Sequence, residues 1–324
     1  MTTPEDPAAQ AWDPRRLPDL TGRRYLVTGA NRGLGFFASE QLSGAGAHVI
    51  MSGRSPNRLA AAKTALLRRN PDASVETILL DTSNLGSVRA AAASIRTARR
   101  LDGLLLNAGI VHPPKERETT RDGHEIVLAT NVLGHFALAG ALLTTLADTA
   151  RTHGVARLVW LGSMSAALWR YDPVDPQLVD TYTPWRAYVQ SKIATGSLGF
   201  EADRKLSAAG VPVQSIVAHP GYSISGRTRG IRGVNEPTRA TRFTDNLQTP
   251  ITQSKEHGAW PLVRALADPS VVGGQYWGPR FVAKGAPRAS TPPAITTDPE
   301  IAARLWASAE EATGIHWPLR AARG

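Results

Sequence analysis

Along most of this chain, short apolar runs typical of buried strands alternate with segments whose apolar residues recur at helical spacing. Short apolar runs predict buried strands at residues 24–28, 47–51, 74–80, 101–106, 157–161 and 213–217. Apolar residues at helical spacing predict helices at residues 34–45, 57–69, 84–96 and 184–209, and one long, bent helix over 123–149. Strands that alternate with helices in this way are typical of an α/β fold with a parallel sheet.

The chain contains no Gly/Ser-rich or Pro-rich linker between residues 24 and 220, so we expect one α/β domain within the 324 residues. We assign residues 1–19 to an N-terminal extension, 20–285 to the domain and 286–324 to a C-terminal extension. The apolar pattern of residues 299–313 in that extension predicts an amphipathic helix that ends at Gly314.

Residues 223–250 differ from the rest of the domain because they are polar and show no clear period. A long segment of this kind is a candidate lid over a substrate. As a lid, the segment would bind an acidic substrate through its arginines. The alternative, which we favour, is that the segment is a solvated loop. The five arginines are Arg227, Arg229, Arg232, Arg239 and Arg242.

A glycine-rich turn lies between the first predicted strand and the first long helix, with the sequence Thr-Gly-Ala-Asn-Arg-Gly-Leu-Gly at residues 28–35. Exposed N–H groups and the helix dipole attract phosphate at such a position. Glycines at Gly29, Gly33 and Gly35 let a dinucleotide's diphosphate approach the backbone. The pattern therefore predicts a nucleotide-binding turn.

The second strand is followed by Ser52-Gly53-Arg54, without the acidic residue that binds the ribose 2′-hydroxyl of NAD. Arg54 and Arg32 suit a 2′-phosphate instead, which favours NADP(H) over NAD(H). The alternative is that both arginines are solvated surface residues.

Tyr188 and Lys192 are four residues apart on a predicted helix, so their side chains project from one face. A nearby ammonium group favours the phenolate, and we expect Lys192 to lower the pKa of Tyr188. The alternative is a core tyrosine followed one turn later by a solvated lysine. Ser163 lies upstream, after the strand at 157–161.

These segments together resemble the short-chain dehydrogenase/reductase family over about residues 20–278, and are most similar to its retinol-dehydrogenase-like and actinobacterial NADP-dependent members. The resemblance implies a Rossmann-type, doubly wound parallel sheet flanked by helices. It is carried by residues 28–35, Leu80-Asp81, Asn107-Ala-Gly109, residues 130–136, Ser163, Tyr188-Val-Gln-Ser-Lys192 and His219-Pro-Gly221.

The resemblance also implies residue roles. Tyr188 would be the general acid for reduction and the general base for oxidation, with Lys192 binding the nicotinamide ribose. Ser163 would hydrogen-bond the substrate oxygen, and Asn131 would hold a water next to Lys192. The family often has two consecutive serines at this step, whereas here only one hydroxyl remains. We assign the role to Ser163, with Ser165 as the alternative. The implied cofactor contacts are Gly29, Asn31, Arg32, Gly33, Leu34, Gly35, Arg54, Asp81 (to the adenine), Thr82, Asn107, Ala108, Gly109, Tyr188, Lys192, Pro220, Gly221, Ser223 and Ser225.

Composition narrows the remaining classes of function. The net charge is +10, but the basic residues are scattered and form no nucleic-acid recognition motif, so we expect no nucleic-acid partner. The chain has no cysteine, which excludes disulfides and thiolate metal sites, and we expect no metal centre. We find no apolar run of membrane-spanning length and expect a cytoplasmic protein. The family resemblance implies a homodimer or homotetramer.

The sequence thus predicts an NADP(H)-dependent oxidoreductase that interconverts a ketone or aldehyde and an alcohol. Aromatic residues around the expected pocket suit a bulky, lipophilic or secondary-metabolite substrate; they are Trp169, Tyr182, Trp185, Tyr222 and Phe243, while Trp160 is expected in the core. The alternative is a non-catalytic NADP(H)-binding sensor on the same fold. We read His112, His135 and His219 as structural.

Overall fold

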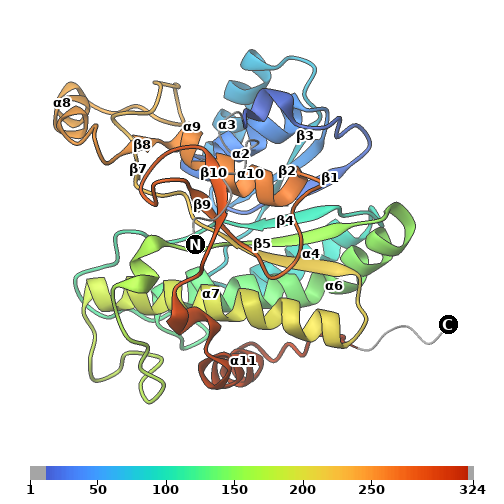
Figure 1. The fold of residues 1–324 in the computed structure, drawn as a ribbon, viewed down its shortest axis with the longest axis vertical. Coiled ribbons are helices and arrows are strands. Elements are labelled where there is room, and N and C mark those ends of the chain that lie inside the picture. The colour runs from blue at the N-terminus through green and yellow to red at the C-terminus, as the bar shows by residue number, and fades with distance from the viewer. Residues whose placement is uncertain (1–11, 320–324) are drawn as a thin grey trace, which may run out of the picture.

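The computed structural model describes residues 12–319, which form an eight-stranded sheet with helices on both faces (Figure 1). The strand order is β10-β9-β6-β5-β4-β1-β2-β3, and all neighbours are parallel except β9 and β10. This confirms the doubly wound Rossmann-type sheet. The strands are β1 (Arg24–Val27), β2 (His48–Gly53), β3 (Val75–Leu79), β4 (Gly103–Leu106), β5 (Ala156–Leu161), β6 (Val213–Ala218), β9 (Tyr276–Pro279) and β10 (Pro287–Ser290).

The two faces of the sheet are covered by different sets of helices. In Figure 1, α2 (Gly33–Gly44), α3 (Pro56–Arg69) and α10 (Trp260–Ala267) lie above the sheet. Below it lie α4 (Leu85–Arg96), α6 (Gly134–His153) and α7 (Pro184–Ala208). Two apolar cores result, one on each face, as a two-sided parallel sheet requires. The remaining elements are η1 (Pro14–Arg16), α5 (Ile126–Leu128), η2 (Ala129–Leu133), η3 (Met164–Ala167), β7 (Ser223–Ile224), α8 (Arg239–Leu247), β8 (Gln253–Ser254), α9 (Lys255–Gly258), η4 (Ala294–Thr297) and α11 (Pro299–Thr313).

Most helix boundaries follow from capping residues in the sequence. The Asn84 side chain accepts a hydrogen bond from Ser87 N at the start of α4, as expected. Thr183 caps α7 and Asp298 caps α11, each followed by a proline at the first helical position. Gly314 ends α11 in the left-handed conformation with φ 64°. These helices therefore begin and end where local chemistry dictates.

The helix expected over residues 123–149 begins later, at Ile126, and contains one turn of π-helix, η2, before α6. The continuous stretch Ile126–His153 contains an 18-residue window with a mean hydropathy of 1.9 and is long and apolar enough to cross a membrane, contrary to our expectation that no run reaches this length. Of its most apolar window, 83% is buried inside the fold. The stretch is apolar because it forms the centre of one core.

The segment 223–250 is not a structureless loop, because it contains β7 and α8. Three of its five arginines hold the segment together or anchor it. Arg227 donates to the carbonyls of Thr249 and Thr252, and Arg242 donates to those of Gly226 and Thr228. Arg229 forms ion pairs with Glu40 and Glu256. These three guanidinium groups are therefore occupied by protein partners.

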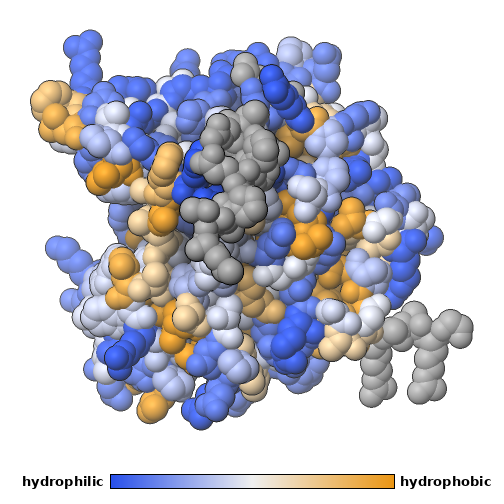
Figure 2. Space-filling model, in the orientation of Figure 1, coloured by the Kyte–Doolittle hydropathy of each residue, from blue (hydrophilic) through white to orange (hydrophobic). Residues whose placement is uncertain are grey.

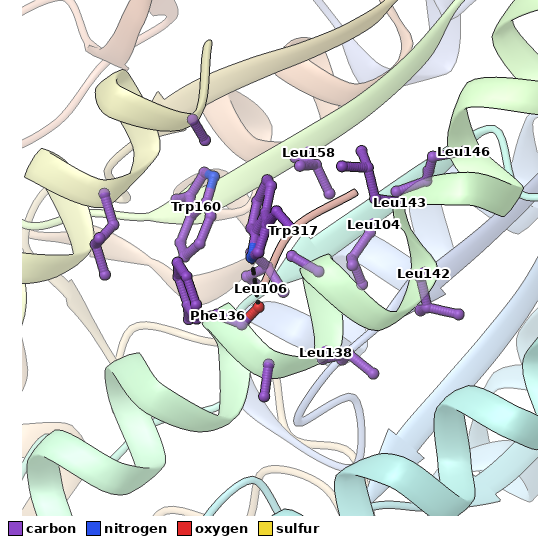
Figure 3. Close-up of a cluster of buried hydrophobic side chains, with 14 of the residues drawn as sticks. Leu104, Leu106, Phe136, Leu138, Leu142, Leu143, Leu146, Leu158, Trp160 and Trp317 are labelled. Atoms are coloured by element: carbon purple, nitrogen blue, oxygen red, sulfur yellow. Dashed lines mark hydrogen bonds between the residues drawn. The ribbon is translucent and has the colours of Figure 1, made fainter. Parts of the chain in front are cut away.

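The C-terminal segment closes one core. Residues 287–290, which we assigned to the C-terminal extension, form the edge strand β10, so the sheet continues past residue 285. The helix α11 packs on α7, and beyond it Trp317 is buried between α6 and β5 (Figure 3). The Trp317 indole donates to the Phe136 carbonyl at 3.2 Å, and Gly140 leaves room for its ring. Trp160 lies in the same core, as expected.

Candidate active site

The carboxyl ends of the parallel strands bring the predicted cofactor segments to one edge of the sheet. Backbone hydrogen bonds join Thr28 to Leu105, Ala30 to Ser52 and Leu80 to Gly53. The glycine-rich turn after β1 is thereby flanked by the ends of β4 and β2. In open α/β sheets this edge is where ligands bind.

Close backbone contacts explain the glycines of the turn. Gly29 has φ 65°, and a methyl group at Gly29 would lie 2.9 Å from the Ala108 Cα. A methyl group at Gly35 would lie 2.6 Å from both Asn107 Nδ2 and the Gly29 carbonyl oxygen. The Asn107 amide in turn donates to the Thr28 carbonyl at 2.7 Å. The segment Asn107–Gly109 is therefore packed directly against the turn, as the resemblance implied.

The first turn of α2 is open to an anion. Arg32 is its N-cap residue in extended conformation and provides no side-chain cap, so the first N–H groups of Gly33, Leu34 and Gly35 have no capping acceptor. The side chains of Arg32 and Arg54 are both exposed. Arg54 follows β2 directly, and Asn31 Oδ1 lies 3.1 Å from where a methyl group on Gly53 would be. The two arginines thus flank the same turn.

Asp81 and Thr82 follow β3 at the same edge of the sheet. The Asp81 carboxylate accepts hydrogen bonds from the backbone N–H and hydroxyl of Ser83. Thr82 is buried, and its carbonyl oxygen packs against Gly134, where a methyl group would approach within 1.9 Å. The structure therefore holds this loop against the start of α6 and leaves Asp81 half-buried at the sheet edge.

Ser163 lies at the centre of a hydroxyl cluster after β5. Its Oγ is 3.4 Å from the Tyr188 hydroxyl, which donates to it, and 2.8 Å from the Ser165 Oγ. The backbone N–H of Ser165 also donates to Ser163 Oγ at 3.1 Å. The geometry places Ser163 next to Tyr188, with Ser165 behind it as a hydrogen-bond partner. Both serines belong to the site, and Ser163 is the one bonded to the phenol.

Lys192 is buried and Tyr188 is partly buried, and this removal from water has the largest effect on the pKa of each group. Burial lowers the pKa of Lys192 to about 8, and its ammonium group donates to the Leu161 carbonyl at 2.7 Å. Burial raises the pKa of Tyr188, while the neighbouring hydroxyl groups of Ser163 and Ser165 lower it to a smaller extent. Our expectation that Lys192 lowers the pKa of Tyr188 is wrong here, because burial outweighs the neighbouring polar groups. Tyr188 is therefore a protonated hydrogen-bond donor at neutral pH.

Asn131 connects helix α7 to Ile110, which follows the segment Asn107–Gly109. Its side-chain oxygen accepts from Ile110 N at 2.7 Å, and its amide donates to Ser191 Oγ at 2.9 Å. Ser191 Oγ then donates to the Tyr188 carbonyl at 2.7 Å. Ser191 is a positioning residue that the sequence did not single out, because a serine inside a helix carries no distinctive signal.

His135 is structural, with its ring buried between the turn and η2. One ring nitrogen lies 3.0 Å from Thr28 Oγ1 and the other 3.1 Å from the Asn131 carbonyl oxygen. Burial lowers the pKa of His135 to about 3, so the ring is neutral. His135 thereby ties the glycine-rich turn to the segment that carries Asn131.

The segment after β6 lines the opposite side of the cleft. Gly221 has φ 60° and is packed against the Ala283 carbonyl, which is 2.3 Å from the position of a methyl group. Ser223 donates to the Pro220 carbonyl, so its hydroxyl is used within this turn. Ser225 accepts a hydrogen bond from Lys255 Nζ at 2.6 Å. Lys255 is a residue that sequence analysis missed, because nothing in its local sequence relates it to the glycine-rich turn.

One exposed aromatic residue, Trp185, lies beside Tyr188. The Trp185 ring is 6.3 Å from the Tyr188 ring, centre to centre, and is 49% exposed. Trp169 is 50% exposed on the loop after η3. A groove of about 550 Å³ between α7 and residues 292–302 contains none of the four predicted catalytic residues. This groove is therefore separate from the predicted catalytic residues.

Comparisons with known proteins identify the family of this chain. A family model described as short chain dehydrogenase matches residues 23–229. Mouse polyprenol dehydrogenase is 33% identical over 304 residues, covering 93% of this chain and 87% of that protein. Human retinol dehydrogenase 13 is 30% identical (92% and 87% covered), and a probable oxidoreductase of Streptomyces lividans is 35% identical (89% and 96% covered).

Among solved structures, an uncharacterized protein from Mycobacterium paratuberculosis superposes with a TM-score of 0.77. It is 33% identical to this chain, and the match covers 95% of this chain and 99% of that one. These matches confirm the family resemblance that the sequence motifs indicated.

Proposed function

The chain belongs to the short-chain dehydrogenase family, and on that premise we propose that it is an NADP(H)-dependent oxidoreductase that interconverts a lipophilic alcohol and the corresponding aldehyde or ketone. The observation that carries the proposal is the hydroxyl cluster of Ser163 and Tyr188, with Lys192 buried on the same helix. This cluster lies after β5, at the edge of the sheet where the glycine-rich turn follows β1.

The residues at this edge fit a nicotinamide dinucleotide. Gly29 and Gly35 leave no space for a side chain, and the first turn of α2 offers uncapped N–H groups to a diphosphate. Arg32 and Arg54 would hold the 2′-phosphate, and Asp81 would contact the adenine. When bound, the cofactor supplies or accepts the hydride.

Side chains of the protein would stabilise the substrate's carbonyl oxygen and supply its proton. During reduction, negative charge develops on the carbonyl oxygen, and Tyr188 and Ser163 donate hydrogen bonds to it. The raised pKa of Tyr188, caused by burial, keeps the phenol protonated until it delivers its proton to that oxygen. Lys192 holds a positive charge close to the reacting centre, and Ser191 and Asn131 fix the helix turn that carries Tyr188.

We expect the double variant Arg32→Met/Arg54→Met to raise the Kd for NADPH about tenfold and to leave the Kd for NADH unchanged. Only NADPH carries the 2′-phosphate that two exposed guanidinium groups would bind, and exposure limits the size of the effect. Energy transfer from the protein's 8 Trp to the reduced nicotinamide measures both constants.

Arg68→Met is the matched control, since Arg68 is also exposed but lies at the far end of α3. Equal weakening of NADPH and NADH by the double variant would contradict the assignment of these arginines to the 2′-phosphate.

Exposed apolar side chains on α7 and α8 are the observation in favour of a lipophilic substrate. Trp185 lies beside Tyr188, and α8 buries none of its residues and exposes Phe243 and Leu247 by 67% and 69%. In Figure 2, hydrophobic residues gather over α8 at the upper left, above a hollow in the surface. Relatives named for polyprenol and retinol, which are long apolar alcohols, point to the same substrate class.

The decisive experiment compares carbonyl substrates of increasing apolar length. With NADPH, we expect kcat/KM to rise from a short aldehyde to retinal and to a polyprenal, because each added buried methylene contributes about 0.8 kcal/mol. Trp185→Ala should raise KM for the long substrates only. Equal or better turnover of short, polar carbonyls would contradict a lipophilic substrate, and absence of turnover with all of them would favour a cofactor-binding sensor.

A further inference from the structure

Lys255 connects two parts of the cleft that are far apart in sequence. Its Cδ lies 3.7 Å from the position that a methyl group on Gly33 would occupy, and its Nζ donates to Ser225 Oγ at 2.6 Å. The side chain therefore extends along the first residue of α2 toward the segment that follows Gly221.

The placement of Lys255 is well defined by its surroundings. Lys255 N donates to Thr228 Oγ1 at 2.9 Å, and Ser254 caps α9 by accepting from His257 N. Gln41 Nε2, on α2, donates to the Glu256 carbonyl at 3.1 Å. The helix α9 is thus fastened to α2, and Lys255 is held at the end of α2 where the glycine-rich turn lies.

The ammonium group of Lys255 has no anionic partner. The side chain is half-buried, and within residues 12–319 no carboxylate forms an ion pair with it. Burial and the nearby Arg32 lower the pKa of Lys255, and Asp245 raises it to a smaller extent. The Asp245 carboxylate is itself occupied by Gly226 N at 2.6 Å. Two cations next to an uncapped helix start are electrostatically unfavourable unless an anion binds between them.

We propose that Lys255 binds the diphosphate of the nicotinamide dinucleotide, in addition to the backbone N–H groups of the glycine-rich turn. This inference rests on the proposed function. An ammonium group against phosphate oxygens makes charge-assisted hydrogen bonds, and Ser225 orients it.

The sheet order distinguishes this role from binding of the 2′-phosphate. Lys255 approaches the turn from the side of Ser225, which follows β6, whereas Arg54 follows β2. In the sheet, β6 and β2 lie on opposite sides of β1, which carries the turn. Lys255 therefore serves the part of the cofactor between the turn and the catalytic residues, and this part is identical in NADPH and NADH.

The test is the Kd for NADPH and for NADH in wild type, Lys255→Met, Lys255→Arg and Lys284→Met, measured by fluorescence titration. We expect Lys255→Met to raise both constants by the same factor, about tenfold, and Lys255→Arg to restore most of the affinity. Lys284→Met is the matched control, because its ammonium also donates to one uncharged oxygen, that of Thr249, and should change neither constant. Thermal unfolding checks that the variants are folded, and Lys255→Gln replaces the methionine variant if that one is not.

Each other outcome overturns the inference in a distinct way. An unchanged Kd in Lys255→Met, while wild type binds NADPH, removes Lys255 from the cofactor site but leaves the proposed function intact. Weakening of NADPH alone assigns Lys255 to the 2′-phosphate instead. Failure of the wild type to bind either cofactor contradicts the proposed function and this inference together.

Discussion

Replacing Tyr188 with phenylalanine is expected to lower kcat for carbonyl reduction by about 10²–10⁴-fold and to leave the Kd for NADPH unchanged. The substitution removes only the hydroxyl that donates to Ser163 Oγ, and with it the proton that the carbonyl oxygen must receive. The ring stays packed beside Trp185, so the helix and the cofactor cleft remain in place. Single-turnover oxidation of NADPH with retinal measures the chemical step directly.

Tyr182→Phe provides the matched control for this prediction. Its hydroxyl donates to the Pro114 carbonyl at 2.8 Å, so that variant also loses one phenolic hydrogen bond, but none to Ser163. We expect its kcat to remain near the wild-type value. If the two variants turned over equally well, Tyr188 would not be the proton donor. Loss of cofactor binding in Tyr188→Phe would instead indicate a structural role.

Trp317→Ala is expected to lower the free energy of unfolding by about 3–5 kcal/mol. The Trp317 ring is buried, lies 4.9 Å from the Trp306 ring and 5.4 Å from the Phe136 ring, and fills the space that Gly140 leaves. The alanine variant would leave a cavity between α6 and β5 and would remove the indole hydrogen bond to the Phe136 carbonyl (Figure 3). Urea unfolding followed by circular dichroism gives the difference from the wild type.

Trp169→Ala is the control, because Trp169 is half-exposed on a loop. We expect it to change the free energy of unfolding by no more than about 0.5 kcal/mol. If both tryptophan variants unfolded at the same urea concentration as the wild type, the segment after α11 would contribute nothing to the core. A loss confined to Trp317→Ala would establish that the C-terminal segment is part of the folded domain.

Local chemistry explains why much of the fold could be predicted from the sequence. The run at 101–106 is mostly apolar because β4 is buried on both faces of the sheet. A strand with one face in water would instead alternate apolar and polar residues. Thr183 before Pro184 and Asp298 before Pro299 mark helix starts, because a capping oxygen and a ring without an N–H need only their own neighbours. The doubly wound arrangement of the sheet, by contrast, was implied only by the family resemblance, and the strand order was not predicted.

The parts of the fold that the sequence did not predict depend on distant partners. The helix α8 buries none of its residues, so no apolar stripe toward the core marked it. The strand β10 pairs with β9 through backbone groups, and its residues Arg288 and Ser290 are polar and exposed at the sheet edge. The stretch 126–153 was predicted as one long helix over 123–149, but its length and apolarity, which are sufficient to cross a membrane, were not recognised from the sequence.

Local sequence patterns were enough to identify the residue types that could carry chemistry here. The spacing of Tyr188 and Lys192 on one helix, and the glycines of residues 28–35 between a strand and a helix, follow from local geometry alone. The environment of those groups depends on how the whole chain packs. Burial raises the pKa of Tyr188, and the Lys192 ammonium group donates a hydrogen bond to the Leu161 carbonyl. Folding of the chain also brings Lys255 next to Gly33. Desolvation and contacts between distant segments depend on the whole packed chain, and no local pattern encodes them.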